Sequence, residues 1–195
     1  WLFTGLNVLR AKVIAKYNLN EFQFSQNYCF FYDQLEKSNL FLQAIIDTRG
    51  KEMTDKTVEW LFKNPIGDGG QFTGVINIIN KYGVVPSEIM PETNSSNNTS
   101  RMSQLISLKL REYGLQLRAM GAKGIKEDAL IAKKQEMLQT IYRILAINLG
   151  VPPTTFSYTQ KDASGKPIST KTYTPQSFFK EFVDVDMSNY VMIMN

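Results

Sequence analysis

The chain has 195 residues, 43% of them hydrophobic, as expected for a soluble globular protein of one domain or slightly more. Its net charge is only +4, and no apolar run reaches the ~18 residues that a membrane span needs. These figures argue against a membrane protein. They also argue against a nucleic-acid-binding surface, because its basic residues are spread out and such a surface needs a clustered basic face.

Hydrophobic periodicity predicts a mostly helical chain. In the first expected helix, residues 2–17, apolar side chains recur at steps of three or four and line one face. These side chains are Leu2, Leu6, Leu9, Val13 and Tyr17. The other expected helices cover residues 25–47, 55–63, 71–82, 101–120, 125–149 and 174–183.

Capping residues set several of these boundaries. Ser25 is a favourable N-cap for the second helix, which is aromatic on nearly every side and should be buried. Gly83 and Gly150 are helix-ending glycines. Thr174 followed by Pro175 is an N-cap with proline at the first helical position, which opens a short last helix.

The remaining segments predict loops and strands. Residues 156–160 and 168–173 alternate as strands do, and the turn at 163–166 should join them as a hairpin. Residues 190–194 also have strand character. Residues 94–100 form a polar stretch that contains three glycosylation-type triplets, at Asn94, Asn97 and Asn98, but we favour a plain loop that caps the next helix.

The composition leaves out the usual catalytic sets. There is no histidine, so the chain holds neither a Cys-His nor a Ser-His pair and no His-based metal site. We expect neither a metal nor a cofactor. Cys29 lies within an aromatic helix without a cationic neighbour, and we interpret it as a small buried filler. Asp184 and Asp186 could share one face of a strand, but we interpret them as solvated surface acids.

The turn at residues 65–70 is the most informative segment for binding. Its paired glycines, Gly69 and Gly70, would let another backbone approach closely because no Cβ stands in the way. Such a turn could exchange backbone hydrogen bonds with an extended peptide. It could equally be a tight loop that leads into a helix, and spacing alone does not decide between the two.

Several short segments, in this order across nearly the whole chain, resemble the bleomycin hydrolase and aminopeptidase C family of papain-like cysteine peptidases. They are Trp-Leu-Phe at 1–3, Leu-Asn-Val-Leu-Arg at 6–10, Phe-Gln-Phe-Ser-Gln at 22–26, Phe-Phe-Tyr-Asp at 30–33, Asp-Gly-Gly-Gln at 68–71, Lys-Tyr-Gly-Val-Val-Pro at 81–86, Pro-Glu at 91–92 and Leu-Gly-Val-Pro-Pro at 149–153.

This resemblance implies an α+β fold that is predominantly helical here. It would be the helical part of a papain-like proteinase with extra helices, most of the sheet-bearing half being absent. The implied domains are a subdomain at 1–90 with the nucleophile helix and the Gly-Gly segment, a long-helix hairpin at 91–153, and an incomplete part at 154–195. The start at Trp1 and the end in an apolar run lead us to expect that both ends are cuts in a longer protein.

The resemblance also implies where the chemistry would lie. The family's nucleophilic cysteine stands directly before the residue that matches Trp1, and its histidine and asparagine belong to the part that follows Asn195. No catalytic residue is therefore carried over to this chain. The residues carried over as substrate-binding are Trp1, Asp68, Gly69 and Gly70, and Gly70 is the more favoured of the two glycines.

The implied parent protein is a cytoplasmic thiol aminopeptidase that acts on peptides through a thioester and assembles as a homo-hexamer, although export is not excluded. We expect the 195-residue chain alone to be inactive. The alternative interpretation is a non-catalytic helical binding module, possibly for nucleic acid. The densest basic stretch, at residues 123–134, is diluted by Glu127 and Asp128, which makes nucleic acid an unfavoured partner.

Overall fold

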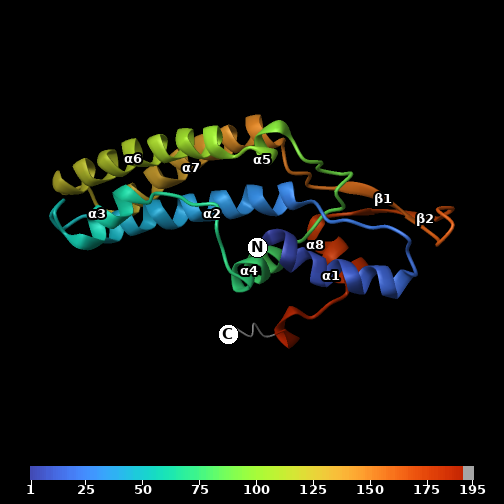
Figure 1. The fold of residues 1–195 in the computed structure, drawn as a ribbon. Helices are drawn as coiled ribbons and strands as arrows, with labels where there is room; N and C mark the ends of the chain where they lie inside the picture. Colours follow the sequence, from blue (N-terminus) through green and yellow to red (C-terminus); the bar gives the residue numbers. More distant parts are fainter. Residues whose placement is uncertain (191–195) are drawn as a thin grey trace. The chain divides into compact units, whose positions relative to one another are not determined.

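The structure, a computed structural model, describes residues 1–190 and is mostly helical with one small antiparallel sheet (Figure 1). Within this part of the chain, no helix is both long and apolar enough to cross a bilayer. Its helices and strands are α1 (Leu2–Tyr17), α2 (Gln26–Asp47), α3 (Lys56–Lys63), α4 (Phe72–Tyr82), α5 (Asn94–Asn97), α6 (Ser100–Ala122), α7 (Glu127–Leu149), β1 (Phe156–Lys161), β2 (Pro167–Tyr173), α8 (Pro175–Ser177), η1 (Phe178–Val183) and η2 (Met187–Asn189).

The capping residues expected from the sequence are found at the helix ends. The Ser25 hydroxyl accepts a hydrogen bond from the Tyr28 amide at 3.0 Å, at the start of α2. Asp55, which the sequence did not single out as a cap, also caps α3 by accepting from the amides of Thr57 and Val58. Thr174 accepts from the Ser177 amide in a capping box at the start of α8. Side-chain oxygens of residue types that commonly cap helices thus accept hydrogen bonds from the free first amides of these helices.

Two expectations need correction. The loop expected at 94–100 contains the short helix α5. The last helix does not run uniformly, because the α-turn of α8 continues as the π-helical turn η1. Asp184, which ends η1 in a left-handed conformation, and Asp186 are both exposed, as expected of surface acids. The strand expected at 190–194 lies outside the described residues, except for Tyr190.

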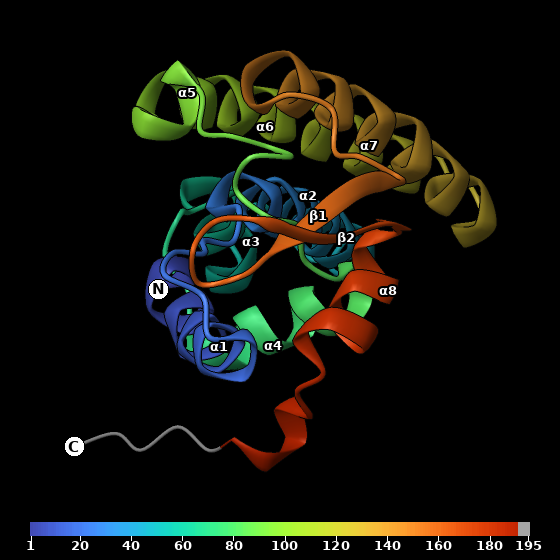
Figure 2. The same cartoon turned by 90° about the vertical axis from the view of Figure 1, so that its right-hand side faces the viewer.

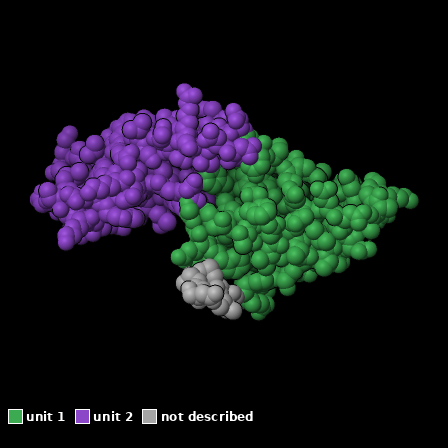
Figure 3. All heavy atoms as spheres, in the orientation of Figure 1, with its two compact units in different colours: residues 1–32, 69–93, 151–195 green, residues 33–68, 94–150 purple. Residues whose placement is uncertain are grey.

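Chain contacts divide the molecule into two compact units, each built from separated segments (Figure 3). Unit 1 comprises residues 1–32, 69–93 and 151–195, and unit 2 comprises residues 33–68 and 94–150. These units are defined by contacts within the chain, so they do not test the domain division at 90 and 153 that the family resemblance implies. That division stays a prediction.

In unit 1, α1 lies beside α4, and the β1–β2 hairpin projects from the same unit (Figures 1 and 2). The hairpin pairs Phe156 with Tyr173 at its base, and its turn is closed by the Asp162 carboxylate, which accepts from the Ser164 and Lys166 amides. An aromatic core forms where β1 meets η1, with Tyr158 packed edge-on against Phe178 and Phe182 of that turn. This core buries one face of the hairpin.

In unit 2, α6 and α7 pack against each other along an apolar seam. The buried seam residues recur at helical spacing and are Met102, Ile106, Leu110 and Leu117 on α6, with Leu130, Met137, Ile141, Leu145 and Leu149 on α7. Their periodicity gives each helix one apolar stripe, which is why two helices of 23 residues can stand side by side.

Candidate functional site

Helix α1 is held in unit 1 by its apolar face, and its first turn is formed at Trp1. Trp1 is the N-cap residue, and its carbonyl accepts the Gly5 amide at 3.0 Å. Leu9 and Val13 are completely buried. The helix ends at Asn18, whose left-handed conformation stops it. The first amides of α1 therefore point out beyond Leu2, and the helix dipole makes this tip electropositive.

Close contacts between α1 and α4 fix the position of this tip. A Cβ atom added at Gly5 would lie 2.9 Å from two methyl groups of Val75, a buried residue of α4. One turn earlier, the Trp1 indole lies against the glycines that precede and begin α4. A Cβ added at Gly74 would lie 3.3 Å from the ring, and one added at Gly70 would lie 2.7 Å from it. Only glycine allows so close an approach at Gly70.

The predicted binding turn therefore lies next to the start of α1. Residues 67–71 are all exposed. The two paired glycines have different surroundings: the Cβ position of Gly70 is filled by the Trp1 ring, whereas nothing lies within 4 Å of the Cβ position of Gly69. The structure thus brings Trp1 and Gly70 together and leaves Gly69 open to solvent. A substrate-binding role for these residues and for Asp68 stays a prediction.

Two residues of α2 that the sequence did not single out, Gln34 and Lys37, contact the start of the turn. The carbonyl of Gly67 accepts from Gln34 Nε2 at 3.1 Å and from Lys37 Nζ at 3.0 Å. The same two donors bind the Asp33 carboxylate, at 3.1 Å and 2.7 Å respectively. A signal for this cluster was present, since Asp33 and Lys37 are an i,i+4 charge pair in a largely aromatic helix.

The electrostatics of this cluster centre on Asp33. Its side chain is only 7% exposed. Burial raises the pKa of the Asp33 carboxyl above its usual range, although the hydrogen bond from Lys37 opposes this effect. The negative charge of Asp68 adds to the rise, which places Asp68 within electrostatic reach of Asp33. The cluster therefore combines a buried acid, a half-buried lysine and the carbonyl at the entry of the turn.

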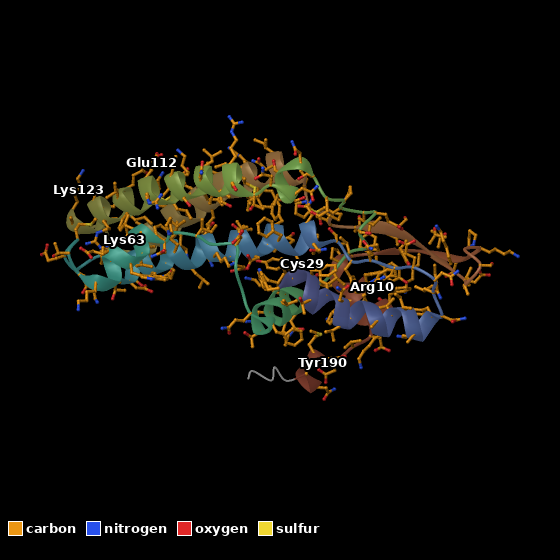
Figure 4. The ribbon with its side chains drawn as sticks, viewed as in Figure 1. Arg10, Cys29, Lys63, Glu112, Lys123 and Tyr190 are labelled. Atoms are coloured by element: carbon orange, nitrogen blue, oxygen red, sulfur yellow. The ribbon has the colours of Figure 1, made fainter. Side chains whose placement is uncertain are left out.

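Cys29, labelled in Figure 4, is completely buried, as expected of a structural filler. Its neighbour Tyr28 donates its hydroxyl to the Tyr82 carbonyl at 2.7 Å. Burial strongly raises the pKa of Tyr28, so this hydroxyl remains a donor. Within residues 1–190, no group of three or more acidic or cysteine side chains is arranged to hold a metal ion.

A separate hollow of about 440 Å³ lies in unit 1 between the segment after α1, residues 86–88 and the hairpin. Its lining includes Glu88, Asp162 and Lys161. Burial, followed by the charge of Glu88, raises the pKa of the Tyr158 hydroxyl at its wall to about 12. None of the predicted site residues lines this hollow, so it is distinct from the Trp1–Gly70 contact.

A helix whose electropositive tip lies beside an exposed glycine turn is the arrangement that the resemblance to papain-like cysteine peptidases led us to expect. Comparison with known proteins agrees with that class. The whole chain, residues 1–195, matches the Peptidase C1-like family, and the chain belongs to this family.

Individual relatives give the branch of the family. The chain is 38% identical over its full length to aminopeptidase C of Lactobacillus delbrueckii subsp. lactis and 37% identical to bleomycin hydrolase of Gallus gallus. It covers 43% and 44% of those proteins. The crystal structure of PepW from Lactobacillus rhamnosis matches 94% of the chain with a TM-score of 0.90 and 37% identity, over 41% of that chain. The chain thus spans less than half the length of these relatives.

These matches confirm the resemblance and the fold class. The chain is the helical part of a papain-like fold with a small two-stranded sheet, and its relatives are cysteine peptidases of the aminopeptidase C and bleomycin hydrolase type.

Proposed function

We propose that this chain supplies the helical side of the substrate cleft in a cysteine aminopeptidase. The full-length enzyme would remove N-terminal residues from peptides by acyl transfer to a cysteine, followed by hydrolysis of the thioester. The observation that carries this proposal is the contact between Trp1 at the tip of α1 and Gly70 of the exposed turn. This contact supports the proposal because a helix N-terminus favours a thiolate and can face an oxyanion, and the exposed turn beside it would offer backbone groups to a peptide.

In this proposal the residues of the chain bind and orient, and the reacting groups come from elsewhere in the full-length protein. Asp68, Gly69 and Gly70 would present backbone groups to the substrate, and Trp1 would form one wall of the cleft. The chain has no histidine, and its single cysteine is fully buried, so its own residues make no nucleophile–base pair. The homo-hexameric assembly and the cytoplasmic location belong to the same proposal.

The full-length protein provides the test. We expect it to release a coumarin dye from aminoacyl amides and to lose this activity completely when thiols are alkylated. A Cys29→Ala variant should behave as the unmodified protein does in both respects, because Cys29 is buried away from solvent. Absence of thiol-dependent turnover in the full-length protein would refute the proposal.

The isolated 195-residue chain gives the complementary measurement. We expect no thiol-dependent turnover from it with the same substrates, because it contains no imidazole base. Turnover that disappears in the Cys29→Ala variant of the isolated chain would mean that Cys29 is a nucleophile and that this assignment of roles is wrong.

The alternative of a nucleic-acid-binding module gains no support from the basic stretch on α7. Lys133 forms an ion pair with Glu136 at 2.6 Å, and Lys134 donates to the Gln43 amide oxygen at 2.7 Å. These lysines are thus engaged within unit 2 rather than gathered on a free basic face.

A further inference from the structure

The exposed turn at residues 67–70 is held at its first residue, through the carbonyl oxygen of Gly67. The Gly67 carbonyl receives two hydrogen bonds, from Gln34 and Lys37, and both donors are tied in addition to Asp33. All four residues belong to unit 2, and the three donors and acceptors on α2 lie within two helical turns. The chain then runs through Asp68 directly into Gly69 and Gly70.

The residues that hold Gly67 include buried polar groups, which lower the stability of the fold. Gln34 is completely buried, and its Oε1 atom has no hydrogen-bond partner among the described residues. The amide cannot be reversed to relieve this, because both Asp33 and Gly67 offer acceptors to its nitrogen. A buried acceptor without a partner and a buried carboxylate both destabilise the fold. A gain in stability therefore does not by itself account for the hydrogen bonds to Gly67.

The high glycine content of the turn gives a reason for holding the Gly67 carbonyl in place. Three of the four residues at 67–70 are glycine, and such a segment loses much conformational entropy when it becomes ordered against a ligand. Holding the Gly67 carbonyl removes part of this freedom before the ligand arrives. Pre-organisation of this kind strengthens binding by lowering the cost of ordering.

We propose that Asp33, Gln34 and Lys37 form an anchor, here named the Gly67 anchor, that positions the 68–70 turn for pairing with the substrate backbone. This inference rests on the proposed function of the turn. The three residues are positioning residues, since they act through the Gly67 carbonyl. Lys37 and Gln34 supply the donors, and Asp33 holds both donors in place.

Kinetics of the full-length enzyme test the anchor. Lys37→Met and Gln34→Leu should each raise KM for an aminoacyl coumarin amide by roughly tenfold, the effect of one lost hydrogen bond from a charged or fully buried donor. The turnover number should not change, because backbone pairing is made equally in the ground and transition states. Lys37→Arg should restore the original KM, because a guanidinium can donate to both the carboxylate and the carbonyl. Unchanged KM in both loss variants would overturn the anchor.

The matched control is Lys63→Met. Lys63 also lies in an i,i+4 ion pair, with Glu59 at 3.8 Å, but it is exposed on α3. It should leave KM unchanged. If Lys63→Met raised KM as much as Lys37→Met does, the effect would come from the general loss of a lysine, and the anchor would be refuted.

Hydrogen exchange separates failure of the anchor from failure of the proposed function. Amides at residues 68–71 should exchange faster in Lys37→Met than in the unmodified full-length protein, while those of α6 and α7 stay the same. An inactive full-length protein with this exchange pattern would refute the peptidase assignment and leave the anchor standing as a structural element. An active protein with no change in exchange or KM would refute only the anchor.

Discussion

The two compact units achieve close packing in different ways. In unit 1, glycines admit a bulky group where a Cβ could not fit: Gly70 faces the Trp1 indole, and Gly83 lies against the backbone of Pro175. In unit 2, α6 and α7 share a long seam of alternating apolar side chains, and the closest glycine contact, at Gly114, leaves 3.0 Å from the end of the Phe62 ring. In unit 1, a few contacts that only glycine allows thus set the positions of the packed segments. In unit 2, many similar apolar contacts set the positions of the two helices.

This difference between the units indicates which backbone segments must be positioned accurately. A seam of many similar side chains gives stability and tolerates adjustment, because each side chain contributes a small share. A contact that only glycine permits fixes two backbone segments against each other. Of the proposed cleft residues, Trp1, Gly69 and Gly70 lie in unit 1, which uses contacts of this second kind. A Gly→Ala substitution at one of these close contacts should therefore cost more stability in unit 1 than in unit 2.

The largest effect should come from Gly83→Ala. Gly83 has a φ of 75°, and an added Cβ would overlap the Pro175 backbone, which cannot rotate away. We expect a loss of about 2–5 kcal/mol in unfolding free energy, from the left-handed conformation and the overpacking together. Denaturant unfolding of the full-length protein measures this loss. A variant as stable as the original would show that unit 1 can relax as readily as unit 2.

Gly70→Ala should have the next largest effect. The added Cβ would lie 2.7 Å from the Trp1 ring and displace it, which we expect to cost about 1–3 kcal/mol and to lower kcat/KM. Gly69→Ala is the matched control, because its Cβ position is open, and it should leave the unfolding free energy within about 0.5 kcal/mol of the original value. Equal destabilisation by the two substitutions would contradict the different roles assigned to these neighbours.

Gly114→Ala should change stability less than Gly83→Ala or Gly70→Ala does. The substitution favours the interior of α6 by up to about 1 kcal/mol, and the half-buried Phe62 ring can shift by the few tenths of an ångström required. We expect an unfolding free energy within about 1 kcal/mol of the original. A loss as large as that from Gly83→Ala would remove the contrast between the units.

Asp33→Asn should produce an effect confined to a pH window. The Asp33 pKa is raised in the folded state, so the folded protein binds a proton more readily than the unfolded chain does. The contribution of Asp33 to stability is complete below its unfolded pKa of about 3.9 and is lost as pH rises through the folded value. The difference in unfolding free energy between the original protein and Asp33→Asn should therefore shift in favour of the variant over that window. A shift of opposite sign would mean that the Lys37 ion pair outweighs burial.

Much of the helical framework follows from local signals. The first helix was expected at 2–17 and lies there, because its apolar spacing and the Asn18 stop are properties of neighbouring residues. The hairpin and its turn were predicted for the same reason. Two expectations failed where local signals were weak. Residues 94–97 of the expected loop form the helix α5, and the last helix widens into the π-turn η1, where large aromatic residues pack against Tyr158.

In the candidate site, too, some features follow from residue type and others only from the tertiary structure. Its glycine turn was visible in the sequence, and so was the absence of histidine, because both are matters of residue type. That the Trp1 ring fills the Cβ space of Gly70, and that Gln34 and Lys37 hold a carbonyl 33 and 30 residues away, was decided by tertiary structure alone. Such contacts join residues that are distant in the chain, and no periodicity or capping rule relates one partner to the other.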